Sequence, residues 1–301
     1  MENKDGWIIY SKFIINKKEK NGDKEETIKY AKDKFNLNID IISSHDFYVS
    51  CEKEGISLYY KGIKLNKLPK FVIFRKYDIY LARQLEMLGV TVLNNSQSMI
   101  DARNKMKTYQ MLSKSNISIP KTLYIVSGVN KKEFSYEEVC KYFNSNKFIL
   151  KYVYGSRGND IHLIEDKIKF NETVKKYNGI CIFQEYIESS YGKDIRCYII
   201  GGKFVGCAVR QSHGDFRSNL AQGGEAVKFD APDKVKELAL NSAKIMNLDI
   251  CGVDILFGNN DEYYVCEVNS LPGFKSINTT TNIRANDLLL ELLYNKLMEN
   301  K

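Results

Sequence analysis

Residues 250–273 read ICGVDILFGNNDEYYVCEVNSLPG, the most informative stretch of the chain. Two apolar runs, 250–257 and 263–268, have the length of single strands and are rich in β-branched and aromatic residues. Between them stands Asn260-Asp261, a dipeptide that favours a tight two-residue hairpin turn. The stretch therefore predicts an antiparallel hairpin, and the position of its turn predicts which residues face each other.

Polar side chains gather on one face of this predicted hairpin. The turn places Asp254 directly opposite Glu267, and Asn269 shares their face two residues further on. The opposite, apolar face then holds Val253, Ile255, Cys266 and Val268. Two facing carboxylates repel each other, and with an amide oxygen they form a donor set that suits Mg²⁺ or Mn²⁺. The alternative is a solvated polar face, because a one-residue slip would separate the two acids.

A second candidate site is the loop Gly155-Ser156-Arg157-Gly158, between apolar runs at 148–152 and 161–164. Glycines let backbone N–H groups approach phosphate oxygens, and the nearby Lys151 supplies a positive charge. The loop is not a P-loop, since it joins strand to strand and lacks the GK[ST] signature. Phosphate binding and a plain turn are both consistent with this pattern.

Two further groups of polar residues are consistent with nucleotide or anion binding. Gln184-Glu185-Tyr186-Ile187 leaves an apolar strand, where backbone groups can meet a flat heterocycle such as adenine. Asp194 and Arg196 share one face of the next strand, and Arg210 and Arg217 follow it. Arginine binds phosphate and carboxylate groups with two parallel hydrogen bonds. An ordinary strand end and surface salt bridges explain the same residues without any ligand.

Composition narrows the function classes. The 45 Lys+Arg residues outnumber 37 Asp+Glu for a net charge of +8, in an ordinary globular mixture of 44% hydrophobic residues. No run approaches the roughly 20 apolar residues of a membrane span, and the start shows no apolar signal segment. The seven cysteines lack CxxC spacing, which fits reduced thiols. We therefore expect a cytoplasmic protein that binds neither a membrane nor cysteine-held zinc.

The order of apolar runs predicts the fold class. Strands and helices alternate over residues 1–100, with buried strands expected at 7–10, 39–42 and 71–74, as in a parallel α/β unit. From Lys147 onward, apolar runs separated by short turn signals predict antiparallel hairpins. We expect an α/β N-terminal domain followed by α+β structure.

In this order, the motifs resemble the ATP-grasp superfamily, and specifically its RimK-like branch of carboxylate–amine (α-L-glutamate) ligases. The resemblance runs from about Phe71 to Leu293. Besides the stretches above, it rests on Arg83-Gln-Leu-Glu-Met-Leu-Gly89 with Asn94, Asn104-Lys105, Ile119-Pro-Lys-Thr122, Phe216-Arg-Ser-Asn219 with Gly223-Gly224, and Gly252-Val-Asp254 with Glu267-Val-Asn-Ser-Leu-Pro-Gly273. Each motif is short, but their shared order along the chain is specific.

The resemblance implies a fold, a cofactor and a set of site residues. A pre-ATP-grasp domain would cover residues 1–100, a central ATP-grasp lobe 101–185 and a C-terminal lobe 186–301, with ATP between the lobes. The residues implied to bind ATP are Lys105, Lys151, Gln184, Glu185, Tyr186, Ile187, Asp194, Arg196, Arg217, Ser218 and Asn219. Asp254, Glu267 and Asn269 would hold two Mg²⁺ ions, or Mn²⁺ in their place. Lys151 and Arg210 would take part in catalysis.

The implied activity is ATP-dependent C–N ligation through an acyl phosphate. The substrates would be an acidic small-molecule or peptide carboxylate and an amino-acid amine such as glutamate, and the assembly a homodimer or homotetramer. Phe274-Lys275-Ser276 departs from the small or acidic residues frequent in members that modify a ribosomal protein, so the acceptor stays open.

Two rival functions are a nucleotide-binding regulatory module and a nucleic-acid-binding protein. The first does not need the full set of metal and catalytic residues. The second predicts a basic stripe with exposed aromatic residues, whereas the basic excess gathers around the ATP motifs, in residues 101–151 and 196–217. We therefore expect no nucleic-acid partner.

Overall fold

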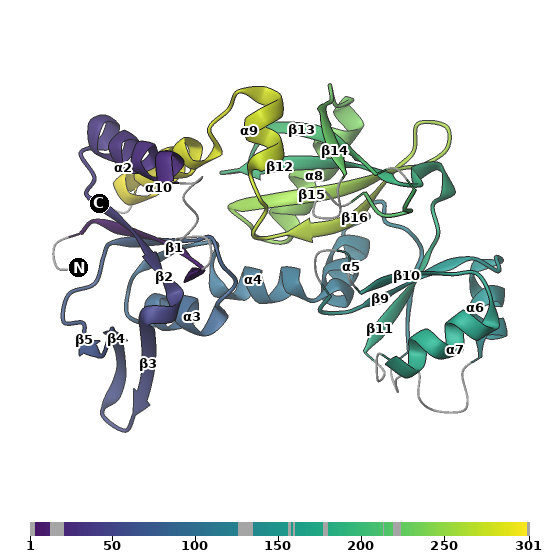
Figure 1. Ribbon diagram of the computed structural model, residues 1–301, viewed down its shortest axis with the longest axis horizontal. Helices are drawn as coiled ribbons and strands as arrows, with labels where there is room; N and C mark the ends of the chain where they lie inside the picture. Colours follow the sequence, from purple (N-terminus) through teal and green to yellow (C-terminus); the bar gives the residue numbers. More distant parts are fainter. Residues whose placement is uncertain are drawn as a thin grey trace.

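The computed structural model describes residues 4–12, 21–125, 135–155, 158, 160–176, 180–212, 214–218 and 224–299. In Figure 1 a domain at the left is joined through the helix α4 to a sheet at the lower right and a larger sheet above it. The α/β region followed by α+β structure confirms the predicted fold class.

The first region is built on a parallel sheet with strand order β2-β1-β6-β7. Its strands are β1 (Gly6–Tyr10), β2 (Ile39–Ser43), β6 (Phe71–Phe74) and β7 (Thr91–Leu93). Helix α2 (Asn21–Phe35) contributes Ala31 to the apolar cluster on one side, and α3 (Ile79–Met87) contributes Leu85 to a second cluster. Burial on both faces explains why the two central strands, β1 and β6, are nearly continuous apolar runs.

A small antiparallel sheet projects from this region and is not predicted by the sequence (Figure 1). It contains β3 (Phe47–Glu52), β4 (Gly55–Tyr60) and β5 (Ile63–Lys64). The buried Gln84 of α3 holds it in place, because its Nε2 donates to the carbonyl oxygens of Ser50 and Ser57, each at 3.0 Å.

Two consecutive helices, α4 (Ser96–Arg103) and α5 (Lys105–Lys114), lead into the central sheet. They are separated at Asn104, whose Oδ1 accepts a hydrogen bond from the backbone N–H of Lys107 at 3.0 Å. Asn104 is thus the N-cap of α5. This cap fixes the position of Lys105 at the start of α5.

The central sheet has the antiparallel order β10-β9-β11-β8. Its strands are β8 (Thr122–Tyr124), β9 (Phe148–Tyr152), β10 (Ile161–Ile164) and β11 (Cys181–Glu185). Two helices, α6 (Tyr136–Phe143) and α7 (Lys167–Lys176), cover one face, where Phe148, Phe170 and Phe183 pack together. The other face carries Lys151 and Gln184.

The larger sheet has the antiparallel order β14-β13-β12-β15-β16. Its strands are β12 (Lys193–Ile200), β13 (Lys203–Gln211), β14 (Glu225–Lys228), β15 (Ile250–Phe257) and β16 (Tyr263–Asn269). Helix α8 (Asp233–Ile245) packs on Ile195, Cys197 and Ile199, all fully buried. Asp194 and Arg196 therefore share the opposite face, as predicted.

The β15–β16 hairpin confirms the predicted pairing of Asp254 with Glu267, but the register between them is less regular than predicted. Near the turn Ile255 pairs with Val265, one residue out of the expected register, and a bulge at Cys266 restores it. Val265 consequently fills the core. The predicted placement of Cys266 on the apolar face is wrong.

The last two helices, α9 (Lys275–Thr281) and α10 (Ala285–Glu299), connect the larger sheet back to the first region. Helix α10 packs beside α2 (Figure 1): the Tyr30 hydroxyl donates to Glu291 at 2.7 Å, and Tyr294 stacks on Phe35 with ring centroids 4.7 Å apart. Within the described ranges, no helix has both the length and the apolar character that a membrane crossing needs.

Candidate active site

A cleft lies between the central sheet and the larger sheet. Most of the predicted site residues line it, namely Lys105, Lys151, Gln184, Glu185, Tyr186, Ile187, Asp194, Arg210, Arg217, Ser218, Asp254 and Glu267. The topology thus brings together residues that are far apart in the sequence, such as the hydrogen-bonded pair Lys105 and Glu267, which are 162 positions apart.

Two predicted residues within the described ranges do not line the cleft. Arg196 is buried beside it, against Asp254, and Asn269 lies at the end of β16. Asn219 falls outside the described residues. Arg196 therefore reaches the site only through the carboxylate that it binds.

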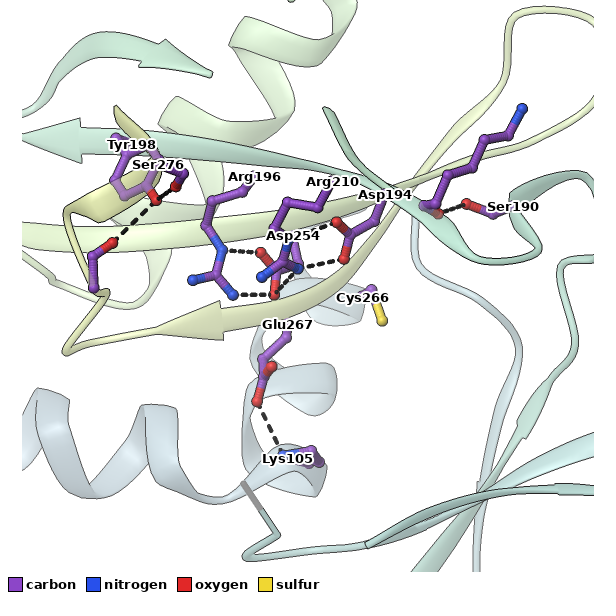
Figure 2. A network of polar contacts seen from close by, with 12 residues as sticks. Lys105, Ser190, Asp194, Arg196, Tyr198, Arg210, Asp254, Cys266, Glu267 and Ser276 are labelled. Atoms are coloured by element: carbon purple, nitrogen blue, oxygen red, sulfur yellow. Dashed lines mark hydrogen bonds and ion pairs between the residues drawn. The ribbon is translucent and has the colours of Figure 1, made fainter. Parts of the chain in front are cut away.

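Alternating charges form a buried network along β13, β12 and β15 (Figure 2). Arg196 donates from Nε and Nη2 to the two carboxylate oxygens of Asp254, with 2.6 Å for the Nη2–Oδ2 bond. Arg210 lies 3.0 Å from the same Oδ2 and donates from Nε to Asp194 at 2.7 Å. These four side chains are at most 10% exposed, so their charges are compensated locally.

The network also sets the ionisation of Asp254. Burial alone would raise the pKa of this carboxyl, but Arg196 and Arg210 outweigh burial and hold the pKa below its ordinary value. Asp254 is therefore an anion at neutral pH despite being 4% exposed.

Lys105 connects three parts of the site. Its Nζ lies 3.0 Å from Glu267 Oε1 and donates to the carbonyl oxygen of Gly155 at 2.8 Å. Burial would raise the pKa of Glu267, but the positive charges of Lys105 and Arg196 together outweigh burial, and the pKa is lowered. One ammonium thus joins the start of α5, the glycine-bearing loop and the predicted metal-binding face.

Lys151 is buried at the centre of the cleft wall. Its Nζ lies 2.5 Å from Gln184 Oε1, 3.3 Å from Cys266 Sγ and 3.4 Å from the Tyr109 hydroxyl. Burial raises the pKa of Tyr109 to about 12, so its hydroxyl stays protonated and donates to the carbonyl oxygen of Cys266. Gln184 in turn donates to Thr122 at 2.9 Å, which fixes the amide that holds Lys151.

Arg217 bridges the two sheets across the cleft. Its guanidinium binds the Asp215 carboxylate, with 2.6 Å from Nη2 to Oδ2, and its Nη1 donates to the carbonyl oxygen of Gly158 at 2.7 Å. The loop after β13 is thereby connected to the described part of the glycine-bearing loop. Ser156 and Arg157 lie outside the described residues.

Several cleft residues are not among the site residues that the sequence predicts. They are Ile149, Ile161, Ser190, Lys193, Phe216, Leu256 and Cys266. Ile149, Ile161 and Leu256 stand in apolar strand runs that look like ordinary core, and Cys266 faces the cleft only because of its bulge. For Lys193 the available signal is its position directly before Asp194.

The predicted metal ligands are chemically suited to Mg²⁺. Asp254 and Glu267 are direct register partners that supply hard oxygen donors. The Oδ1 of Asn269 accepts from the backbone N–H of Leu271 at 3.0 Å, which fixes its amide. No cluster of three or more His, Cys, Asp or Glu with metal-binding geometry occurs among the described residues. This donor set therefore fits an ion that takes its remaining ligands from phosphate oxygens and water.

Comparison with known proteins gives one matching family and many relatives. The family model described as RimK-like ATP-grasp domain matches residues 102–293. A protein named probable alpha-L-glutamate ligase from Methanococcoides burtonii is 32% identical over an alignment of 266 positions, and the match covers 85% of this chain and 86% of that protein. One of the same name from Maridesulfovibrio salexigens is 31% identical and covers 82% and 83% of the two chains.

Solved structures share the fold over nearly the whole chain. The ATP-grasp ligase PsnB, in complex with a phosphomimetic variant of its minimal precursor, Mg and ADP, superposes with a TM-score of 0.69 at 16% identity and covers 99% of both chains. The D-alanine–D-alanine ligase of Bacillus anthracis in complex with ATP gives 0.68 at 18% identity and covers 99% of this chain and 100% of that one.

Proposed function

Because the chain belongs to the RimK-like ATP-grasp family, and is thus an ATP-dependent ligase that joins a carboxylate to an amine, we propose that it adds glutamate or a related amino acid to an acidic carboxylate acceptor. The names of its relatives, probable alpha-L-glutamate ligases, support glutamate as the amine substrate. The observation that carries the proposal is the joint contact of Lys105 with Glu267 and Gly155.

That contact joins the glycine-bearing loop, which is predicted to bind phosphate, to Glu267, which is predicted to bind metal. We call this part of the cleft its phosphate end, and the contact supports it as the reaction centre. ATP-grasp ligases bind ATP and Mg²⁺. We assign the triphosphate to Lys105, Lys151 and Arg217, and adenine to the stretch 184–187. Asp254, Glu267 and Asn269 would hold two Mg²⁺ ions. Bound there, Mg²⁺ would neutralise charge on the transferring phosphoryl group.

The chemistry follows from the poor reactivity of a carboxylate toward amines. A carboxylate oxygen of the acceptor attacks the γ-phosphorus of ATP, the bond to the β-phosphate oxygen breaks, and an acyl phosphate and ADP result. The amine then attacks the acyl carbon, and loss of phosphate and a proton leaves the amide. Lys105 and Lys151 stabilise negative charge on the phosphates.

Arg210 is the residue we assign to the oxyanion that forms when the amine attacks. Within the described chain its Nε and one Nη nitrogen bind Asp194 and Asp254, which leaves the Nη1 group for a developing oxyanion. A guanidinium already held by two buried carboxylates needs no reorganisation during the reaction.

The reaction also requires that water be kept out of the cleft, because hydrolysis of the acyl phosphate would consume ATP without forming the amide. The contact between Arg217 and Gly158 ties the two sheets together over the cleft. We assign to this contact the closing of the site over the acyl phosphate.

The test is ADP release with Mg²⁺ and pairs of carboxylate and amino-acid substrates, with mass spectrometry of the product. We expect ADP and an amide whose mass equals acceptor plus glutamate minus water. A regulatory module of the same fold would bind ATP, which equilibrium dialysis detects, but would form ADP with none of the pairs. That result would contradict the proposed function.

A further inference from the structure

Asn94 belongs to the motifs of the first region, yet it does not line the cleft and lies buried directly after β7. Its Nδ2 donates to the carbonyl oxygens of Ile250 at 2.7 Å and Ser270 at 2.8 Å, and its Oδ1 accepts from the backbone N–H of Ile250 at 2.8 Å. Ile250 begins β15 and Ser270 directly follows β16, so one amide of the first region joins the two open ends of the hairpin. Three hydrogen bonds give this amide a single orientation.

The peptide unit between Ser270 and Leu271 connects Asn94 to a predicted metal ligand. Its carbonyl oxygen accepts from Asn94, and its N–H donates to Asn269 Oδ1 at 3.0 Å. A peptide unit is planar and rigid, so the bond that fixes its carbonyl oxygen also fixes its N–H. The amide of Asn269 is therefore oriented from the first region through one rigid unit. Because an amide oxygen has two lone pairs, Oδ1 can bind a cation at the same time.

The first region also holds the residues that come next in the chain. The side chain of Leu271 packs against an apolar cluster of the first region, and Arg75 Nη2 donates to the carbonyl oxygen of Pro272 at 2.9 Å. Arg75 directly follows β6, and its guanidinium carbon lies 3.9 Å from the centroid of the Phe274 ring. The segment after β16 is thus bound by the first region at three successive residues, 270–272.

We propose that Asn94, supported by Arg75, is a positioning residue of the metal site, because it orients Asn269 for Mg²⁺ from outside the cleft. The proposal rests on the proposed function, which assigns Asn269 to Mg²⁺. Loss of a residue that holds a metal ligand in place typically costs about 10–100-fold in metal affinity or activity. The first region thus contributes to the reaction through a buried amide.

A hydrogen bond of the same kind supplies the control. Ser98 on α4 is 3% exposed, and its Oγ donates to the carbonyl oxygen of Asn247 at 2.7 Å. This bond ties α4 to the segment between α8 and β15, so its acceptor precedes the hairpin. Ser98→Ala therefore weakens the packing near the hairpin without releasing the peptide unit that binds Asn269.

The probe is a fluorescent, non-hydrolysable ATP analogue, and its binding to the full chain is followed by anisotropy while Mg²⁺ is titrated. We expect Asn94→Ala to raise the Mg²⁺ concentration for half-maximal binding at least tenfold, to roughly the extent typical of such residues, and saturating Mg²⁺ to restore binding. Ser98→Ala keeps the wild-type requirement. Arg75→Met retains a contact with the Phe274 ring but cannot donate to Pro272, so it raises the requirement by a smaller factor. It replaces Asn94→Ala if circular dichroism shows that variant to be unfolded.

A double variant tests whether the effect passes through Asn269. If it does, Asn94→Ala, or Arg75→Met in its place, adds nothing to the Mg²⁺ requirement of Asn269→Ala. Additive increases overturn the proposal. An increase in Ser98→Ala as large as that in Asn94→Ala also overturns it, because general loosening then accounts for the effect.

The outcomes separate this proposal from the ligase function. A wild-type Mg²⁺ requirement in Asn94→Ala and Arg75→Met, with a raised one in Asn269→Ala, overturns the positioning role and leaves the ligase function intact. An unchanged requirement in Asn269→Ala contradicts the metal assignment, and the positioning role falls with it. A raised requirement in Asn94→Ala, without ADP release from any substrate pair, supports the positioning role and contradicts the ligase function.

Discussion

Arg196 and Asp254 are register partners on adjacent strands and form a two-bond ion pair with side chains only 10% and 5% exposed. The guanidinium fixes both oxygens of a carboxylate that we assign to metal binding. Arg196 itself does not line the cleft. It is therefore a positioning residue, and its substitution tests whether the geometry of Asp254 matters.

Arg196→Met removes one partner of this buried pair and leaves Asp254 with Arg210 alone. We expect the free energy of unfolding to fall by about 3–5 kcal/mol, the usual result of breaking a buried pair on one side. Urea unfolding measures it. Arg196→Lys keeps the charge but cannot donate two parallel hydrogen bonds to Asp254. It should therefore recover part of the stability. The concentration of Mg²⁺ needed for half-maximal ADP release should still stay above the wild-type value. Wild-type values in both variants would contradict the positioning role.

Glu267→Gln keeps the size of the side chain but removes the charge. We expect ADP release to fall at least 100-fold, because the assigned metal ligand and the partner of Lys105 are lost together. The matched control is Glu262→Gln, an exposed glutamate on the same hairpin, with wild-type turnover. Circular dichroism should show an unchanged fold in both. Full ADP release by Glu267→Gln would contradict the metal assignment.

Arg217→Gln breaks the contact between Arg217 and Gly158 across the cleft. We expect the ratio of amide formed to ADP released to fall well below one, because water gains access to the acyl phosphate. Parallel quantification of ADP and product by mass spectrometry gives this ratio. If the rate falls but the ratio stays at one, Arg217 acts on the phosphates only and does not exclude water.

The free energy of unfolding at low pH depends on Asp254 and Glu267. Both pKa values are lowered from ordinary values of 3.8 and 4.5. Their ion pairs therefore stabilise the fold above those ordinary values, and the stabilisation is lost as pH falls through the lowered pKa values. We expect the free energy of unfolding to decline below about pH 4. Asp254→Asn should flatten that decline, and an unchanged slope would contradict the role of this pair.

The sequence predicts the pairing of Asp254 with Glu267 because hydrophobic alternation and turn chemistry are local signals. It does not predict the bulge at Cys266, since the register is lost near the turn and restored within a few residues. The network around Asp254 depends on β12 lying next to β15, which brings Asp254 beside Arg196 although 58 positions separate them along the chain. Strand order of this kind comes from tertiary packing.

The β3–β4–β5 sheet is missed for a related reason. Its first turn, at Lys53-Glu54, lacks the Asn-Gly or Asp-Gly chemistry that marks a hairpin. Its support comes from Gln84, more than 25 residues downstream, through hydrogen bonds to two backbone carbonyls. A polar residue inside a predicted helix gives no sign of such a distant partner.

The packing of α10 against α2 has a consequence for how the protein is made. Tyr30 and Glu291 touch although 261 residues separate them. At about 5–20 residues per second, the ribosome needs on the order of tens of seconds between the two. Until α10 emerges, the α2 side of the parallel sheet lacks the leucines at 289, 290 and 293 that bury it. The first region to be synthesised is thus among the last to be completed, and a nascent chain carries an open apolar surface for chaperones to cover.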